Sequence, residues 1–125
     1  MKFLFTKAIP LIAIIFLSCS DDDPRKKYPR NVSIQYKVTT TTSGLTANIS
    51  YTNSTGGESD TGFIPLPFST NFSKKVEFGE LLILSAITND PGQIQLEIII
   101  NNNSVKKQTF QSASFVTGTI IYQFD

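Results

Sequence analysis

The chain has 125 residues, of which 40% are hydrophobic and 17% charged, a balance typical of one globular domain and not of a disordered chain. It contains no histidine, and a single cysteine excludes an intramolecular disulfide, so a folded domain must be stabilised by its core. The formal net charge is +1, but from Asn31 onward five basic residues stand against seven acidic ones, which argues against nucleic acid as a partner.

The first 18 residues have the three-part pattern of a bacterial export signal. Lys2 and Lys7 give a positive start, and an uncharged apolar run follows from Ala8 to Leu17. This run is shorter than the ~20 residues that a transmembrane helix needs, so it predicts a cleaved signal peptide. Phe16-Leu17-Ser18-Cys19 resembles a lipobox, the motif at which lipoprotein signal peptidase cuts before a diacylated cysteine. We therefore expect a mature protein that begins at lipid-bearing Cys19; the alternative is an ordinary secretory signal with a free cysteine.

The segment after the cysteine predicts a tether and a cellular location. Ser20, Asp21, Asp22 and Asp23 resemble the acidic signal that sends Bacteroidetes lipoproteins to the cell surface. The alternatives are a simple solvated tether and an anchor that faces the periplasm. Residues 24–30 contain two prolines and four basic residues without apolar periodicity, which predicts a linker. We expect residues 19–30 to hold the domain at the outer membrane, on the cell surface.

From Asn31 onward the hydrophobic pattern changes to period two, which predicts β-strands. The runs that alternate are Val32–Val38, Leu45–Tyr51, Asn71–Phe78 and Ile94–Ile100. Val105–Phe110 predicts a mostly polar strand, and Phe115–Phe124 predicts the last strand of the domain. Ser43-Gly44 separates the first two runs and predicts a hairpin between them. Leu81–Ile87 is apolar on both faces, which predicts a central strand.

The intervening segments predict loops and edges. Asn53–Gly62 is rich in Gly, Ser, Thr and Asp and predicts a loop, and Asn101–Asn103 predicts a turn. Phe63–Phe68 contains two prolines, which predicts an edge segment or an irregular crossover. Together these elements predict an all-β, immunoglobulin-like antiparallel β-sandwich of seven or eight strands over residues 31–125. The core residues that the alternation predicts are Ile34, Tyr36, Ile49, Leu84, Leu96 and Ile98.

The residues offer little for catalysis or metal binding. A nucleophile has no histidine to activate it, and the only cysteine is assigned to lipid. The carboxylate pairs Glu58/Asp60 and Glu77/Glu80 lie in polar segments where solvated side chains are expected. We therefore expect no catalytic residues, no metal site and no cofactor. Three phenylalanines near the proline segment are candidates for an exposed glycan-binding surface, namely Phe63, Phe68 and Phe72.

Several segments, in order along the chain, resemble the MmpS-type transport accessory domain. They are Ile34-x-Tyr36-x-Val38, Ala47–Asn53, Leu66-Pro67-Phe68-Ser69, Leu82-x-Leu84-Ser85-Ala86 and Ile94–Asn101. That domain is an extracytoplasmic β-sandwich beside resistance-nodulation-division exporters, and no catalytic residues come with it. Its mycobacterial members use a transmembrane anchor and often a cysteine pair, whereas this chain has a lipobox-like motif and one cysteine. The resemblance implies a non-enzymatic, lipid-anchored binding or transport-accessory module, with an envelope exporter or another envelope protein as partner. The alternative is a surface lipoprotein that binds a glycan or a host ligand.

Overall fold

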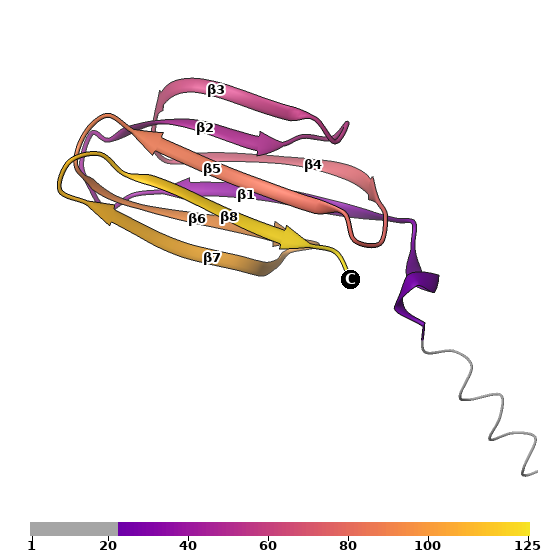
Figure 1. The fold of residues 1–125 in the computed structure, drawn as a ribbon. Helices are drawn as coiled ribbons and strands as arrows, with labels where there is room; N and C mark the ends of the chain where they lie inside the picture. Colours follow the sequence, from indigo (N-terminus) through magenta and orange to yellow (C-terminus); the bar gives the residue numbers. More distant parts are fainter. Residues whose placement is uncertain (1–22) are drawn as a thin grey trace, which may run out of the picture.

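The structure is a computed structural model, and it describes residues 23–125. The eight strands are β1 (Arg30–Thr39), β2 (Thr46–Thr52), β3 (Glu58–Pro65), β4 (Phe68–Val76), β5 (Leu81–Thr88), β6 (Gly92–Ile100), β7 (Asn103–Ser112) and β8 (Thr117–Gln123). They form two four-stranded antiparallel sheets with the orders β4-β1-β6-β7 and β3-β2-β5-β8, stacked face to face (Figure 1). The predicted antiparallel β-sandwich is confirmed, with eight strands.

The core lies between the two sheets, on the faces that the period-two pattern marks. All six predicted core residues are buried. β1 and β6 contribute the alternating residues of one inner face, and β2, β5 and β8 contribute those of the other. The buried phase was therefore predicted correctly in β1, β2, β5 and β6, where the six predicted core residues lie.

The hairpin predicted across Ser43-Gly44 is wrong, because β1 and β2 lie in different sheets. β1 pairs with β4 and β6, and β2 pairs with β3 and β5. The connection is bound to the start of β6 instead of closing on itself. The Thr40 hydroxyl donates to the carbonyl of Gln93, and the Gln93 amide donates to the Thr42 hydroxyl at 3.1 Å. Crossing between sheets lets the apolar faces of β1 and β2 face each other across the core.

The loop predicted over Asn53–Gly62 is correct only in its first half. β3 begins at Glu58 and continues to Pro65, and it pairs with β2 along one side only. Its polar residues fit an edge strand because they remain exposed or half-buried. The segment Phe63–Phe68 lies at the sheet edges as predicted, since β3 ends at Pro65 and β4 starts at Phe68 after the crossing.

The asparagine turn joins β6 to β7 as a tight hairpin. Asn101 and Asn102 both have positive φ, at 49° and 67°, which is the backbone that two-residue hairpins of this type require. Ile100 and Asn103 pair directly across the turn.

The amino-terminal end of the described chain lies against the domain. A short 3₁₀ helix, Pro24–Lys27, precedes β1, and the ring of Tyr28 contacts Phe78 edge-on at 5.8 Å between centroids. The Tyr28 hydroxyl donates to the carbonyl of Asp125 at 3.0 Å, and the guanidinium of Arg30 lies 5.1 Å from the centre of the Tyr28 ring. The start of the described chain and the C-terminus therefore lie at the same end of the sandwich, which we call the tether end after the tether predicted for residues 19–30 (Figure 1).

Candidate binding surface

Most of the predicted anchoring residues, Cys19, Ser20, Asp21 and Asp22, lie outside the residues that the structure describes. Asp23 is described, and its carboxylate caps the 3₁₀ helix by accepting the Arg25 amide at 3.0 Å. The same carboxylate forms an ion pair with the Arg25 guanidinium at 3.3 Å. These hydrogen bonds lower the pKa of Asp23 below its ordinary value, so this residue carries its charge where the tether meets the domain.

One carboxylate of each predicted pair, Glu80 and Asp60, has local structural partners. Glu80 accepts the amide of Glu77 at 3.1 Å and forms an ion pair with Lys74, which closes the β4–β5 turn. Asp60 accepts the amide of Gly62 at 3.0 Å within β3. Over residues 23–125 no three side chains of the types His, Cys, Asp and Glu come together in a way that could hold a metal ion.

The outer face of the sheet β4-β1-β6-β7 is polar. Its middle carries the row Lys37, Glu97 and Lys107, which are neighbours in the strand register. The side-chain amide of Gln35 donates to the Ser69 hydroxyl at 3.0 Å on the same face. This face has the character that water-exposed antiparallel sheets usually have.

The outer face of the other sheet, β3-β2-β5-β8, is different. Five large apolar side chains are exposed on it; we call this set the apolar face, and its members are Phe63, Leu81, Ile83, Ile87 and Ile121. Strands β2, β5 and β8 contain no charged residue, so the only charges on this sheet are those of β3, at one edge. A sandwich that exposes apolar residues together on one face presents a surface suited to an interaction.

The register places these apolar residues in two groups. Ile83 of β5 lies directly opposite Ile121 of β8, with exposed fractions of 39% and 47%, and Leu81 is the next outward residue along β5. Ile87 and Phe63 flank Asn48 on either side near the other end of the sheet. The side chains between the groups are hydroxyls, such as Ser85 and Thr119, whose oxygens lie 3.0 Å apart.

Sequence reasoning identified β5 correctly as a central strand but did not identify this surface. Leu81–Ile87 is apolar on both faces, and that pattern is usual for a strand covered on both sides. In the structure only Leu82, Leu84 and Ala86 within this run are buried. An exposed face rich in Leu and Ile cannot be told from a covered one by sequence pattern alone.

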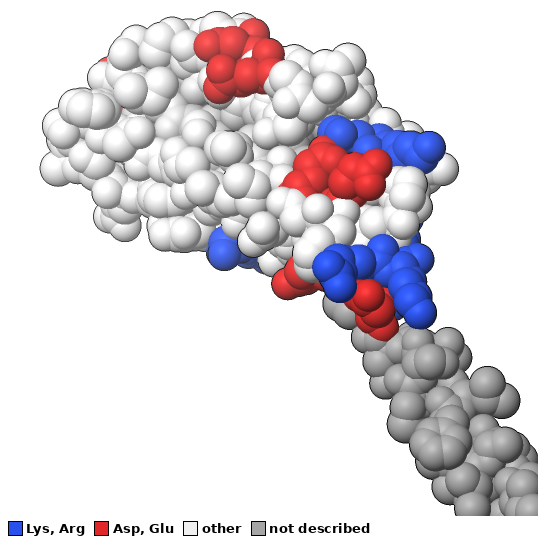
Figure 2. Space-filling model, turned by 45° about the vertical axis from the view of Figure 1, so that its right-hand side comes forward, with Lys and Arg blue, Asp and Glu red and all other residues white. Residues whose placement is uncertain are grey.

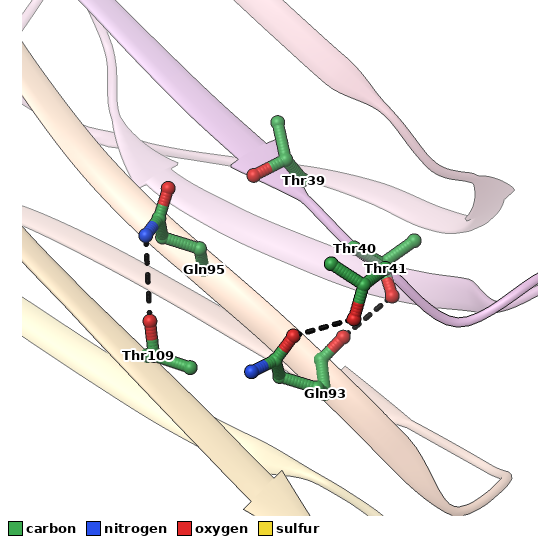
Figure 3. Close-up of a pocket in the computed structure, with 6 residues that line it drawn as sticks. All are labelled: Thr39, Thr40, Thr41, Gln93, Gln95 and Thr109. Atoms are coloured by element: carbon green, nitrogen blue, oxygen red, sulfur yellow. Dashed lines mark hydrogen bonds between the residues drawn. The ribbon is translucent and has the colours of Figure 1, made fainter.

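A shallow pocket of about 280 Å³ lies on the polar outer face, at the end away from the tether. Its lining consists of Thr39, Thr40, Thr41, Gln93, Gln95 and Thr109 (Figure 3). The hydroxyl of Thr41 donates to the Gln93 side-chain oxygen at 2.6 Å, and the side-chain amide of Gln95 donates to the Thr109 hydroxyl at 3.4 Å. Most of the polar groups therefore already have partners within the pocket.

A second pocket of about 240 Å³ borders the apolar face, where the β2–β3 loop meets β5. Ile83 and Tyr51 form its apolar part, and Gly56, Gly57 and Glu58 form its rim. It extends the surface around Ile83 from a flat sheet into a shallow depression.

Charged side chains concentrate near the tether end. Figure 2 shows basic and acidic groups around the point where the described chain begins, while much of the remaining surface in this view is uncharged. Lys74 and Glu80 belong to this charged zone and pair with each other. In this view the basic groups lie beside acidic ones and do not form a patch of one sign.

Of the three phenylalanines proposed for glycan contact, only Phe63 is exposed, at 48%. Phe68 and Phe72 pack against the core, and the ring of Phe72 lies 5.8 Å from that of Tyr36. Phe115, just before β8, is a further exposed aromatic residue that the sequence pattern had placed at the start of a strand.

No protein-family model and no curated protein sequence matches this chain. Within residues 23–125 there is no helix long and apolar enough to cross a bilayer.

Proposed function

We propose that the protein is a non-enzymatic lipoprotein of the outer membrane, anchored through Cys19 and displayed on the cell surface. Its sandwich serves as a binding or transport-accessory module, and its partner is an envelope exporter or another envelope protein. The observation that carries the binding role is the contrast between the two outer sheet faces. One is polar and crossed by a row of charges, whereas the other exposes Ile83, Ile87 and Ile121 on strands without charge.

The lipid anchor is supported by the apolar run and the small residue before Cys19. Only a thiol can accept the diacylglyceryl group, and two or more acyl chains give stable membrane attachment. Cys19→Ser should therefore abolish labelling by an alkyne fatty acid in growing cells. It should also move the protein out of the membrane fraction. Label retained on the variant would refute lipidation at this residue.

The export role of the acidic run is testable apart from the fold. Asp21→Ala with Asp22→Ala removes two charges but leaves Asp23, which caps the 3₁₀ helix. We expect the double variant to remain lipidated and to become less accessible to protease added to intact cells. Unchanged accessibility would mean that the run is only a solvated tether.

The binding role is tested by site-specific photo-crosslinking of the full chain in its own cells. A photoreactive side chain at Ile83 or Ile87 should form an adduct with an envelope protein, and one at Gln35 on the polar face should not. Ile83→Asp should abolish the adduct formed from position 87 while leaving the folded state intact, because residue 83 is outward-facing. Adducts of equal yield from both faces would contradict the proposal.

A second candidate function, glycan binding, is favoured by the hydroxyl- and amide-lined pocket around Thr39 and Gln93. Sugars present hydroxyl groups that such side chains can hydrogen-bond. Backbone NMR shifts during titration with soluble polysaccharides would locate such binding. Shifts at Thr39, Thr40 and Gln95 would support it, and their absence would leave the apolar face as the sole candidate.

A further inference from the structure

The edge of β8 has free backbone hydrogen-bonding groups. The Val116 carbonyl accepts the Thr88 amide at 2.8 Å, and the Phe124 amide donates to the Glu80 carbonyl at 2.9 Å. Backbone groups of an antiparallel strand alternate in direction, so even-numbered residues here bond toward β5. The amides and carbonyls of the odd-numbered residues point away from β5, in the plane of the sheet, and lie along its open edge. These residues are Thr117, Thr119, Ile121 and Gln123, and their side chains are exposed on the outer face.

The sandwich has four edge strands, and the other three carry features that oppose pairing with another strand. β3 contains two carboxylates and Pro65 and is irregular in register, and β4 contains Lys74 and Lys75. β7 contains Lys106 and Lys107 and meets a register shift in β6. Charges, prolines and bulges are the means by which natural sheets protect their edges. β8, with the sequence Thr-Gly-Thr-Ile-Ile-Tyr-Gln, has none of them.

We propose that β8 pairs with β8 of a second copy of this chain, in antiparallel fashion about a two-fold axis. The pairing joins the two β3-β2-β5-β8 sheets into one continuous eight-stranded sheet. Because β5 and β8 are uncharged, the two-fold places no like charges of these strands opposite each other, whereas β4 and β7 each carry two adjacent lysines. The β8 edge is self-complementary under this two-fold, so its partner is a second copy of the same chain.

The register follows from the length of the strand. An axis through Ile120, the midpoint of β8, pairs all seven residues of one copy with all seven of the other. Thr119 then lies opposite the partner's Ile121, and the outward amides and carbonyls of both strands satisfy each other. The outer faces lie on the same side of the joined sheet. Ile83 and Ile121 of both copies therefore form one apolar surface instead of two separate ones.

The test uses the unlipidated chain from Ser20 to Asp125, because all eight strands and the core lie within residues 23–125. Sedimentation velocity over a concentration series should show a monomer–dimer equilibrium. Thr119→Lys places two cations diagonally across the two-fold and should raise the dimer dissociation constant by about tenfold or more. The matched control is Ser73→Lys, which adds the same side chain to the exposed face of edge strand β4 and should leave the constant unchanged.

Amide hydrogen exchange identifies the edge itself. Protection of the amides of Thr117, Thr119 and Ile121 should rise with protein concentration in the wild type and remain low in Thr119→Lys. Protection of Ile120 should not change, since its amide already bonds to β5. A monomer at every concentration would overturn the proposal, as would a dimer that survives Thr119→Lys or shows no added protection in β8. The photo-crosslinking result does not bear on this outcome, because it concerns a different protein as partner.

Discussion

At the scale of single residues, stability depends on side chains such as Leu84, which is completely buried in the middle of β5. Leu84→Ala should lower the free energy of unfolding by ~2–5 kcal/mol, through lost transfer energy and the cavity left behind. Gln95→Ala, on the outer face of β6, should change it by no more than about 0.5 kcal/mol. Chemical denaturation of the chain from Ser20 measures both values. Equal effects of the two substitutions would contradict the burial of Leu84.

Tyr36 combines burial with a hydrogen bond, since its hydroxyl donates to the Thr52 carbonyl at 2.7 Å. Burial first, then the nearby Tyr51 and Glu80, raise the pKa of the Tyr36 phenol far above its ordinary value. The folded state therefore keeps this proton where the unfolded chain loses it. The stability from Tyr36 is complete below the ordinary tyrosine pKa of ~10 and falls as the pH rises above it.

Alkaline titration followed by tyrosinate absorbance tests this expectation. Tyr36 should ionise only as the domain unfolds. Tyr36→Phe should remove tyrosinate amplitude from the unfolding step. It should also cost about 0.5–1.5 kcal/mol at neutral pH, through loss of the hydrogen bond to Thr52. If Tyr36→Phe removed amplitude below the pH at which the domain unfolds, the phenol would be accessible to solvent and the inferred shift would be wrong.

At the scale of strands, the sequence predicted most elements and their buried faces, but not their pairing. Period-two alternation is a local property, so it located β1, β2 and β6 and the buried phase of each. Whether consecutive strands pair or cross between sheets depends on contacts distant in sequence, such as those of Thr40 and Thr42 with Gln93. The predicted β1–β2 hairpin failed for this reason.

β3 shows why a polar edge strand is hard to recognise. Its ladder with β2 is irregular between Asn48 and Ser50, and the Ile49 amide donates to the hydroxyl of Thr61 at 3.1 Å instead of to a backbone carbonyl. A side-chain oxygen therefore completes the bonding at this point. Composition rich in Ser, Thr, Gly and Asp is equally typical of a loop, so the pattern contained no signal for the strand. The apolar face was not predicted either. Whether the outer side of β5 is exposed depends on whether another part of the chain packs over it, and local sequence pattern does not contain that information.

Strands β7 and β8 contact each other across the side of the sandwich through Phe110 and Gly118. A Cβ atom at Gly118 would overlap the ring of Phe110. Gly118→Ala should therefore destabilise the domain by about 1–3 kcal/mol. In a Phe110→Ala background the same change should cost less by about 0.5 kcal/mol or more, because the ring is gone.

Thermal or chemical unfolding of the two single variants and the double variant gives this coupling free energy. Gly57→Ala is the matched control, since its Cβ would meet atoms only at 3.6 Å and beyond, which is ordinary contact. It should leave stability within about 0.5 kcal/mol of the wild type. Additive costs in the double variant would show that Gly118 is required by its backbone and not by the ring.

At the scale of the whole molecule, the proposed lipid anchor and the proposed dimer constrain each other. The described chain begins at the end where Tyr28 contacts Asp125, and Asp23 is the fourth residue after Cys19, a span of at most ~14 Å. A two-fold axis through β8 reverses one copy, so the two tether ends lie at opposite ends of the joined sheet. Both lipids reach one bilayer only if the strands lie roughly parallel to the membrane plane. A single anchored copy, in contrast, is free to stand with its tether end down.

Energy transfer to acceptor-labelled lipids distinguishes these orientations. Because Cys19 is assigned to lipid, Glu77→Cys and Ser43→Cys each provide one labelling site, the former at the tether end and the latter at the opposite end of β1. The ten residues of β1 span ~30 Å, so a standing domain would hold Ser43 that much farther from the membrane than Glu77. In vesicles carrying the lipidated wild type we expect nearly equal transfer from both sites, because the paired copies lie flat. In the Thr119→Lys background transfer from position 77 should exceed that from position 43. Strongly unequal transfer in the wild type would mean that anchored copies stand singly, and pairing through β8 would then be confined to the protein free of its membrane.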